Sequence, residues 1–283
     1  MRVLFLLIFG LFTPLPANEK PFLVTKIQYQ FGNQLFQVAA GYALALDHGY
    51  EPLFPDFKSC PHWNVRENYK KVFSKFNADS PSSPILKKLN EAEVNRLGHL
   101  PENVMIHGFF QSEKYFIHHK EEILKLFSPS NEILDRLLEK YQSLLSHQKT
   151  VALHVRTYLA DYGHIPQSKE FHAFPGLEYY KNAVQLLGED CLYLIFSDRI
   201  AWCKKNLSDI APFIVFIEGN HYIDDFYLMT LCDHIITANS SFSWWAAYLN
   251  QNPDKLVITP KNWYGERWRY LTNQIVPKDW IRL

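Results

Sequence analysis

Short apolar runs alternate with amphipathic stretches of helical spacing through the second half of the chain. The apolar runs predict strands at residues 151–155, 192–196, 214–217, 234–238 and 256–259. The amphipathic stretches predict helices at residues 131–147, 177–187, 199–207, 224–232 and 243–250. Strands that read as continuous apolar runs and alternate with helices are typical of a parallel sheet covered on both faces. The pattern therefore predicts an α/β fold with a parallel sheet in the C-terminal half.

The first half of the chain is less regular. Residues 22–29 alternate between apolar and polar positions, residues 30–34 break that pattern, and residues 35–46 return to helical spacing with several small side chains. This order predicts a strand, a tight loop and a helix. The proline-rich stretch 51–103 predicts irregular structure with short helices.

Residues 1–20 form an apolar leader. An apolar run at 3–12 followed by a polar stretch at 18–20 has the layout of a secretory signal. A cut after Ala17 would, however, place Leu15 where a small residue is usual, and the run is too short to span a bilayer. A short membrane-associating leader, a poor signal peptide and a mis-assigned start all stay open.

Composition and charge limit the class of ligand. The chain has 283 residues, 47% of them hydrophobic, so it can bury a core in one large or two moderate domains. Its formal net charge is zero and no Lys/Arg run interrupts it, which argues against a nucleic-acid partner and favours a small neutral or locally anionic ligand. The cysteines and histidines lack zinc-site spacing, and the adjacent His118 and His119 are interpreted as solvated or core residues.

The ends of the predicted strands are the expected place for chemistry. In a parallel α/β sheet, ligands bind beyond the carboxyl ends of the strands. The segments that follow four of the strands should therefore line one crevice; they are residues 154–156, 197–198, 218–220 and 239–243.

Two of these segments together predict a pyrophosphate site. Arg156 follows a strand, and a guanidinium can bind two phosphate oxygens at once. Asn239 to Ser243 lead into a helix, so their hydroxyls can cap it while backbone N–H groups face the crevice. Glycine-rich nucleotide-binding fingerprints are absent, as is a D-x-D pair for a divalent cation, so protein groups must stabilise any leaving diphosphate.

Two further pairs are interpreted as structural. Trp244 and Trp245 are adjacent on a predicted helix and face about 100° apart, so we expect both to pack in the core rather than against a sugar. Asp224 and Asp225 suit the first turn of a helix, where acids meet the positive end of the dipole.

Several motifs together resemble one family. Residues 32–37 (GNQLFQ), 110–116 (FQSEKYF) and 154–156 (HVR) look like its first three motifs, and matching segments follow in the family order at residues 196–203, 225–232, 239–250, 260–263 and 275–281. From about Phe22 onward the chain resembles the galactoside α-1,2-fucosyltransferase family, which is glycosyltransferase family 11, of the bacterial type. The family usually continues the third motif as R-G-D-Y, whereas Arg156 is followed here by TYLADYG, so that Asp161-Tyr162 restores the pair only after two inserted residues.

The resemblance implies a fold and a reaction. The fold is a GT-B-like arrangement of two Rossmann-type domains, with an acceptor-side domain at residues 21–148 and a GDP-fucose-binding domain at 149–283, a return of the last helix to the first domain being left open. The reaction is an inverting transfer of L-fucose from GDP-fucose to the 2-hydroxyl of a terminal galactoside in a glycan or glycolipid. No metal or other cofactor is expected.

The chemistry of an inverting transfer suggests a role for each candidate residue. The leaving pyrophosphate needs positive stabilisation, for which we nominate Arg156, helped by His154 and by the amides of the helix start. The acceptor hydroxyl needs a base, for which we nominate Asp161. Asp198 is expected to hold the guanine or the ribose. Asn33 and Gln34 either hold substrate hydroxyls or fix the start of their helix. The candidate donor-binding residues are Asn33, Gln34, Asp198, Asn239, Ser240, Ser241, Phe242 and Ser243.

Two alternatives remain open. One is a glycosyltransferase of another linkage or donor, and the other is a catalytically impaired protein that binds a glycan or a nucleotide on the same fold. A bacterial enzyme should act at the cytoplasmic face of the membrane, with peripheral membrane contact, because GDP-sugars are made in the cytosol. The leader leaves export or a lumenal location open.

Overall fold

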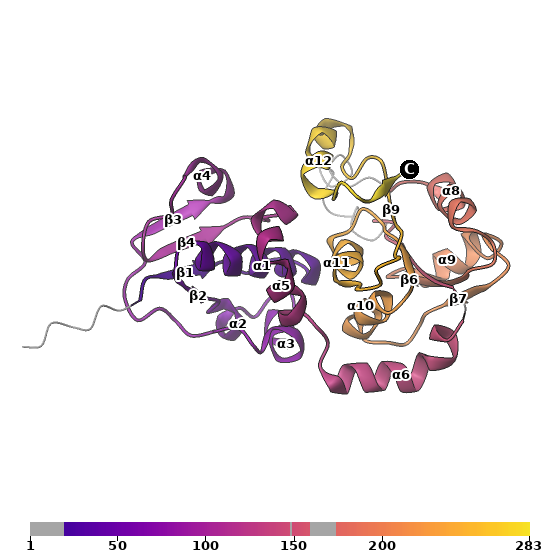
Figure 1. Cartoon of the computed structure of the whole chain (residues 1–283), viewed down its shortest axis with the longest axis horizontal. Helices are drawn as coiled ribbons and strands as arrows, with labels where there is room; N and C mark the ends of the chain where they lie inside the picture. The colour runs from indigo at the N-terminus through magenta and orange to yellow at the C-terminus, as the bar shows by residue number, and fades with distance from the viewer. Residues whose placement is uncertain (1–19, 148, 159–173) are drawn as a thin grey trace, which may run out of the picture.

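Two parallel sheets, each with its own helices, form the frame of the molecule (Figure 1). The computed structural model describes residues 20–147, 149–158 and 174–283, so the leader and Asp161 lie outside the described residues. The first sheet has the strand order β2-β1-β4-β3. Its strands are β1 (Phe22–Thr25), β2 (Glu51–Leu53), β3 (Lys87–Asn90) and β4 (Val104–His107).

The second sheet has the order β10-β9-β8-β5-β6-β7, and its neighbouring strands are all parallel. Its strands are β5 (Thr150–Val155), β6 (Leu192–Ser197), β7 (Ile214–Phe216), β8 (His234–Ile236), β9 (Val257–Thr259) and β10 (Ile281–Arg282). The helices of this half are α8 (Leu177–Leu187), α9 (Ile200–Asn206), α10 (Tyr222–Thr230), α11 (Ser241–Leu249) and α12 (Thr272–Ile275), with the 3₁₀ segment η5 (Glu266–Leu271) before α12. The predicted α/β fold with a parallel C-terminal sheet is confirmed.

The alternation of side chains along β5 explains why helices cover both faces of the second sheet. Val151, Leu153 and Val155 share one buried cluster with residues of α8 and α9. Ala152 points to the other face and belongs to a cluster with residues of α10 and α11. Because successive side chains of a strand point to opposite faces, an apolar run is the pattern that two covered faces require.

Helix α1 (Phe31–Asp47) packs on the first sheet through small residues. Gly41 lies so close to β1 that an added Cβ would stand 1.9 Å from Oγ1 of Thr25. The helix begins four residues earlier than predicted, so Asn33 and Gln34 lie in its first turn rather than in a loop. The prediction of a tight loop over residues 30–34 is therefore wrong for residues 31–34.

The proline-rich stretch contains the predicted short helices together with two strands that were not predicted. The short elements of this half are α2 (Asp56–Ser59), α3 (Val65–Asn68), the π-helical turn η1 (Tyr69–Phe73), α4 (Glu91–Arg96), η2 (Glu113–Tyr115), η3 (Ile117–His119) and α5 (Lys120–Leu126). The two missed strands of this stretch, β2 and β3, lie at the two edges of the sheet, and β4, directly after the stretch, was not predicted either. Pro52 in β2 and two lysines in β3 suit edge strands but obscure a strand pattern.

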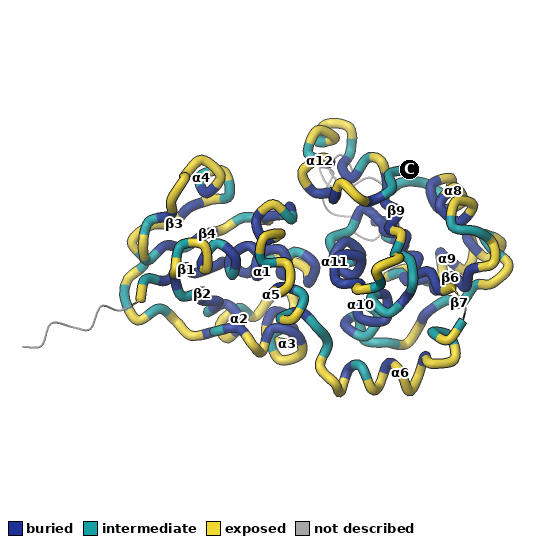
Figure 2. Tube along the Cα trace, in the orientation of Figure 1, coloured by how far each residue is buried: buried dark blue, intermediate teal, exposed yellow. Residues whose placement is uncertain are grey.

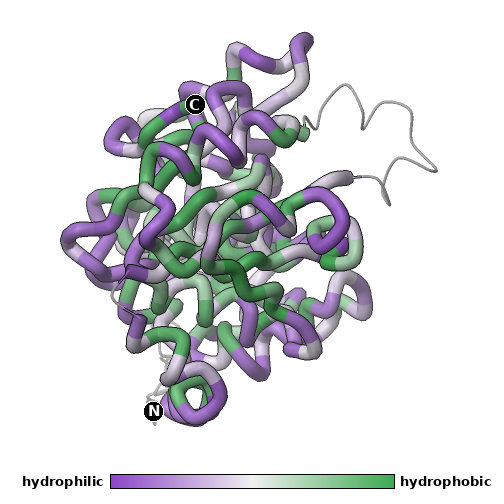
Figure 3. The backbone as a smooth tube through the Cα atoms, turned by 90° about the vertical axis from the view of Figure 1, so that its right-hand side faces the viewer, coloured by the Kyte–Doolittle hydropathy of each residue, from purple (hydrophilic) through white to green (hydrophobic). Residues whose placement is uncertain are grey.

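One aromatic core joins the two halves of the chain. Phe36 of α1 packs against Trp244 and Trp245 of α11, with ring centroids 4.5 and 5.1 Å apart. Both tryptophans are fully buried, which confirms the prediction of core packing. Figure 2 shows the buried residues concentrated in α1, α11 and the inner strands of the two sheets, and Figure 3 shows hydrophobic positions gathered toward the middle of the trace. The indole of Trp244 also donates to the carbonyl of Ile275, which ties α12 to α11.

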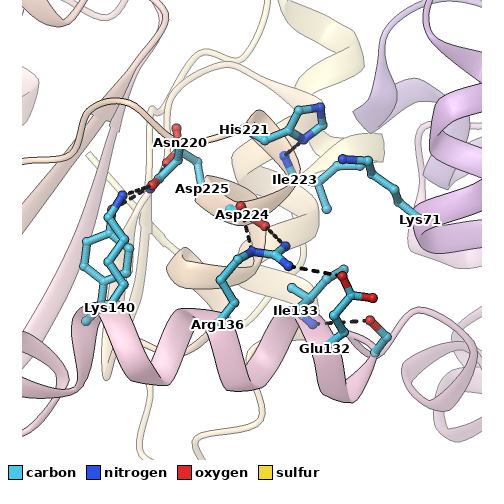
Figure 4. A network of polar contacts seen from close by, with 12 residues as sticks. Lys71, Glu132, Ile133, Arg136, Lys140, Asn220, His221, Ile223, Asp224 and Asp225 are labelled. Atoms are coloured by element: carbon cyan, nitrogen blue, oxygen red, sulfur yellow. Dashed lines mark hydrogen bonds and ion pairs between the residues drawn. The ribbon is translucent and has the colours of Figure 1, made fainter.

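Helix α6 (Asn131–Leu145) connects the two halves and lies along α10 (Figures 1 and 4). Arg136 of α6 donates to both carboxylate oxygens of Asp224, at 2.6 and 3.3 Å. Lys140 donates to the side-chain oxygen of Asn220, whose amide donates to Asp225 at 2.8 Å. Asp224 and Asp225 lie in the first turn of α10, as predicted.

In the described part of the chain, no helix is long and apolar enough to cross a membrane.

Asp225 should make the stability of the protein depend on pH. Burial raises the pKa of its carboxyl to about 6, so the folded state favours the protonated form. Its contribution to stability is present below the unfolded pKa of about 4 and is lost as the pH rises through about 6. We expect the Asp225→Asn variant to lose less stability than the wild type between about pH 4 and about pH 7, by up to about 2 kcal/mol.

Urea unfolding at the two pH values measures this difference. Asp254→Asn, which changes an exposed carboxylate, is the matched control and should behave as the wild type. Equal pH slopes for the wild type and Asp225→Asn would contradict the assignment.

Candidate active site

The starts of α1 and α11 meet between the carboxyl ends of the two sheets. Each helix follows a strand, α1 after β1 and α11 after β8. At Gly32, an added Cβ would lie 2.5 Å from the carbonyl carbon of Ser241 and 2.6 Å from the nitrogen of Phe242. A glycine is therefore required where the two helix starts touch.

A chain of side-chain hydrogen bonds crosses the same region and joins Asn33, Gln111 and Tyr264. We call it the polar bridge. Asn33 accepts a hydrogen bond from the amide of Gln111 at 2.7 Å, and the hydroxyl of Tyr264 donates to the oxygen of Gln111 at 3.1 Å. The three residues follow β1, β4 and β9, so the bridge joins the carboxyl ends of both sheets. Gln111 and Tyr264 were not among the predicted site residues; the only signal in the sequence was that Gln111 falls within a family motif.

Arg156 and Asp198 form an ion pair at the ends of neighbouring strands. Val155 and Ser197 are register partners, so the residues that follow them come together. The guanidinium contacts the carboxylate of Asp198 and lies over the ring of Tyr158, 5.3 Å from its centroid. Both charged side chains remain partly exposed. The structure thus brings two predicted site residues together, and it gives Asp198 an arginine partner that the sequence did not reveal.

Tyr158 connects the end of β5 to the ends of β8 and β9. Its hydroxyl donates to the carbonyl of Asn239, whose amide donates to the carbonyl of Asn262 at 3.1 Å. Tyr158 has a φ of +56°, which is rare for a bulky residue. Such strain persists when the surroundings over-determine it, as here between β5, β8 and β9. Tyr158 was not among the sequence candidates.

His154 is buried, with 6% of its surface exposed, and packs against Phe242 with ring centroids 5.6 Å apart. Burial, followed by the charge of Arg156, lowers the pKa of His154 to about 3. Its Nδ1 atom has no hydrogen-bond partner among the described residues. At neutral pH the ring is therefore uncharged, so the help that His154 can give Arg156 is a hydrogen bond rather than a charge.

The segment 239–243 has the predicted character of a helix cap. Ser240 accepts from the backbone N–H of Phe242 at 3.4 Å, and the hydroxyl of Ser243 accepts from the N–H of Ala238 at 3.2 Å. Ser241 lies against Gly32. The ring of Phe242 packs in the aromatic core, 5.4 Å from Phe226. These side chains therefore shape the turn.

Gln34 is fully buried and all its amide groups are engaged. It donates to the carbonyls of Tyr29 and Trp63, at 2.7 and 2.9 Å, and accepts from the side chain of Asn68 at 2.8 Å. These contacts match the structural one of the two roles that the sequence left open for Gln34. Asn33 is half-buried and belongs to the polar bridge.

The segment 218–220 comes after a strand that is two places away from β5, the strand that precedes Arg156. It follows β7, the edge strand, where Glu218 pairs with Lys204 and Asn220 binds α6. The expectation that this segment lines one crevice with the other three strand ends stays a prediction.

One group of side chains in the described structure could hold a cation. The ligand atoms of Asp47, His118 and His119 lie within 4.8 Å of one another. Asp47 ends α1, about 20 Å from Asn33 at a rise of 1.5 Å per residue. This group is therefore remote from the starts of α1 and α11.

Comparison with known proteins identifies the family. The model of glycosyl transferase family 11 matches residues 12–283. The chain belongs to glycosyl transferase family 11. An alpha-1,2-colitosyltransferase of Escherichia coli is 28% identical to this family 11 chain over 295 residues, covering 92% of the chain and 98% of the relative. A galactoside alpha-(1,2)-fucosyltransferase 2 of Sus scrofa is 26% identical over 234 residues, covering 78% and 67%.

A solved structure confirms the predicted GT-B-like fold of this family 11 chain. The alpha-1,6-fucosyltransferase NodZ, in crystals soaked with GDP-fucose, superposes with a TM-score of 0.51 at 14% identity. The superposition covers 82% of the chain and 93% of NodZ. The two parallel sheets with helices on their faces are thus a GT-B-type arrangement.

Proposed function

We propose that this family 11 glycosyltransferase moves L-fucose from GDP-fucose to the 2-hydroxyl of a terminal galactoside, with inversion. The observation that carries the proposal is Arg156 at the carboxyl end of β5, paired with Asp198. The similarity to a galactoside alpha-(1,2)-fucosyltransferase supports the sugar and the linkage.

Arg156 is the group that stabilises the departing GDP. Negative charge grows on the pyrophosphate as the sugar–oxygen bond breaks, and a fixed cation at that point lowers the barrier. The carboxylate of Asp198 and the ring of Tyr158 hold the guanidinium in place. Neutral His154 lies two residues before Arg156 in the sequence and can add a hydrogen bond.

The N-terminus of α11 adds a second favourable electrostatic interaction with the leaving pyrophosphate. Its first turn follows β8, beside β5 in the sheet, so the positive end of the helix dipole lies on the same side as Arg156. With this charge supplied by the protein, transfer should need no divalent metal. Residues 149–283 would then hold the donor and residues 21–148 the acceptor.

The acceptor hydroxyl loses a proton as it attacks, and Asp161 remains the proposed base. In an inverting displacement the attacking oxygen and the leaving phosphate lie on opposite faces of the sugar. The base must therefore approach from the side away from Arg156.

A donor competition tests the proposal, because colitose lacks one hydroxyl of fucose and the two products differ in mass. The colitosyltransferase relative makes colitose the second candidate sugar. With equal amounts of GDP-linked fucose and GDP-linked colitose and a galactoside acceptor, we expect the fucosylated product to dominate at least about tenfold. Dominant colitose transfer would overturn the donor, and GDP binding without transfer of either sugar would favour the impaired protein.

A further inference from the structure

Three exposed aromatic side chains lie in contact beside the starts of the two central helices. Tyr29, Trp63 and Phe109 are 41%, 41% and 42% exposed. The ring of Tyr29 stacks on Phe109 with centroids 4.9 Å apart and lies 5.4 Å from Trp63. We call these three rings the aromatic platform. Apolar side chains that gather on a surface instead of in the core commonly mark a binding site.

The backbone beneath the platform is strained. Tyr29 has a φ of +68° and Trp63 a φ of +53°, a region that bulky residues rarely adopt. Each such residue costs about 1–3 kcal/mol, so it persists only where the surrounding structure enforces it.

Buried Gln34 enforces this conformation. Its amide nitrogen donates to the carbonyls of both Tyr29 and Trp63, so one core side chain joins the two strained residues. Phe109 is fixed separately, because its N–H donates to the carboxylate of Glu91 at 3.1 Å. The backbone that carries the three rings is therefore held in place before any ligand binds.

The platform borders the candidate active site on the side of the first sheet. Tyr29 precedes Gly32, which touches α11, and Phe109 lies two residues before Gln111 of the polar bridge. Tyr29 and Phe109 follow the carboxyl ends of neighbouring strands, β1 and β4.

We propose that the aromatic platform is the acceptor subsite, on which a neutral pyranose ring of the glycan stacks. A galactoside has an apolar C–H face and polar edges, which matches aromatic rings rimmed by the exposed polar residues Gln30 and Asn64. This inference rests on the proposed function. Gln34 is then a positioning residue that acts through Tyr29 and Trp63.

Kinetics of ring-removing variants tests the subsite. Trp63→Ala and Phe109→Ala should raise the acceptor KM about tenfold, with the KM for GDP-fucose and kcat changed less than about twofold. Phe213→Ala removes a ring that is 51% exposed just before β7 and should leave all three constants unchanged. Trp63→Phe keeps a ring and should recover most of the acceptor affinity. An unchanged acceptor KM in both folded alanine variants would overturn the proposal.

A binding measurement separates this inference from the proposed function. Saturation-transfer NMR with lactose, without donor, should show contact with the galactose ring in the wild type and weaker contact in Trp63→Ala. Lactose binding that depends on Trp63 would support the subsite even if no fucose were transferred. If the variants instead lost binding to anionic vesicles and kept lactose contact, the platform would be a membrane contact and the proposal would be wrong.

Discussion

Replacing Arg156 by alanine is expected to lower kcat/KM for fucose transfer by about two to three orders of magnitude. That is the usual cost of removing one fixed group that stabilises charge in a transition state. The loss should fall mainly on kcat, because the charge on the leaving GDP grows only as the bond breaks. Steady-state kinetics with GDP-fucose and lactose measures it.

Two further variants make the result specific. Arg156→Lys keeps the charge but loses the planar fork, so its activity should fall between those of the wild type and Arg156→Ala. Arg96→Ala removes an exposed arginine of α4 and should transfer as the wild type does. A folded Arg156→Ala variant that kept more than about half of the wild-type kcat/KM would remove Arg156 from the mechanism.

Gly32→Ala is expected to have the second large effect, on stability and transfer together. The added Cβ would lie 2.5 and 2.6 Å from backbone atoms of Ser241 and Phe242, which cannot rotate away. The starts of α1 and α11 must therefore separate, at a cost of about 1–3 kcal/mol for overpacking. Because these helix starts border the site, transfer should fall at least about tenfold even where the protein is folded.

Gly98→Ala is the matched control, since an added Cβ there meets no atom within 4 Å. It should change the free energy of unfolding by no more than about 0.5 kcal/mol. Thermal and urea unfolding compare the two variants. Equal stability of Gly32→Ala and Gly98→Ala would show that the two helix starts are not in close contact.

The sequence predicted the second sheet well because its strands and helices have clear periods. The bounds of α8 were predicted to the residue, since Gly176 and Gly188 flank an amphipathic run. The start of α1 was missed because Gly32 and Asn33 favour loops locally. Packing of Gly32 against Ser241 is a tertiary contact, and no local pattern reports it.

The sequence predicted which residues form the candidate site better than it predicted their pairing and protonation. Arg156 and Asp198 were both nominated, but their pairing depends on the register of β5 and β6. The neutral state of His154 depends on its burial, which its motif does not reveal. Tyr158 was missed because its hydrogen bond to Asn239 joins residues that are far apart in the sequence, and no local pattern reports such a contact.

The most direct test of the account is fucose transfer to lactose in the presence of EDTA, with the linkage of the product determined by NMR. We expect transfer from GDP-fucose to the 2-hydroxyl of galactose, with inversion, at a rate that the chelator does not change. Transfer to another hydroxyl, transfer that needs an added divalent metal, or no transfer by folded protein that binds GDP would contradict it.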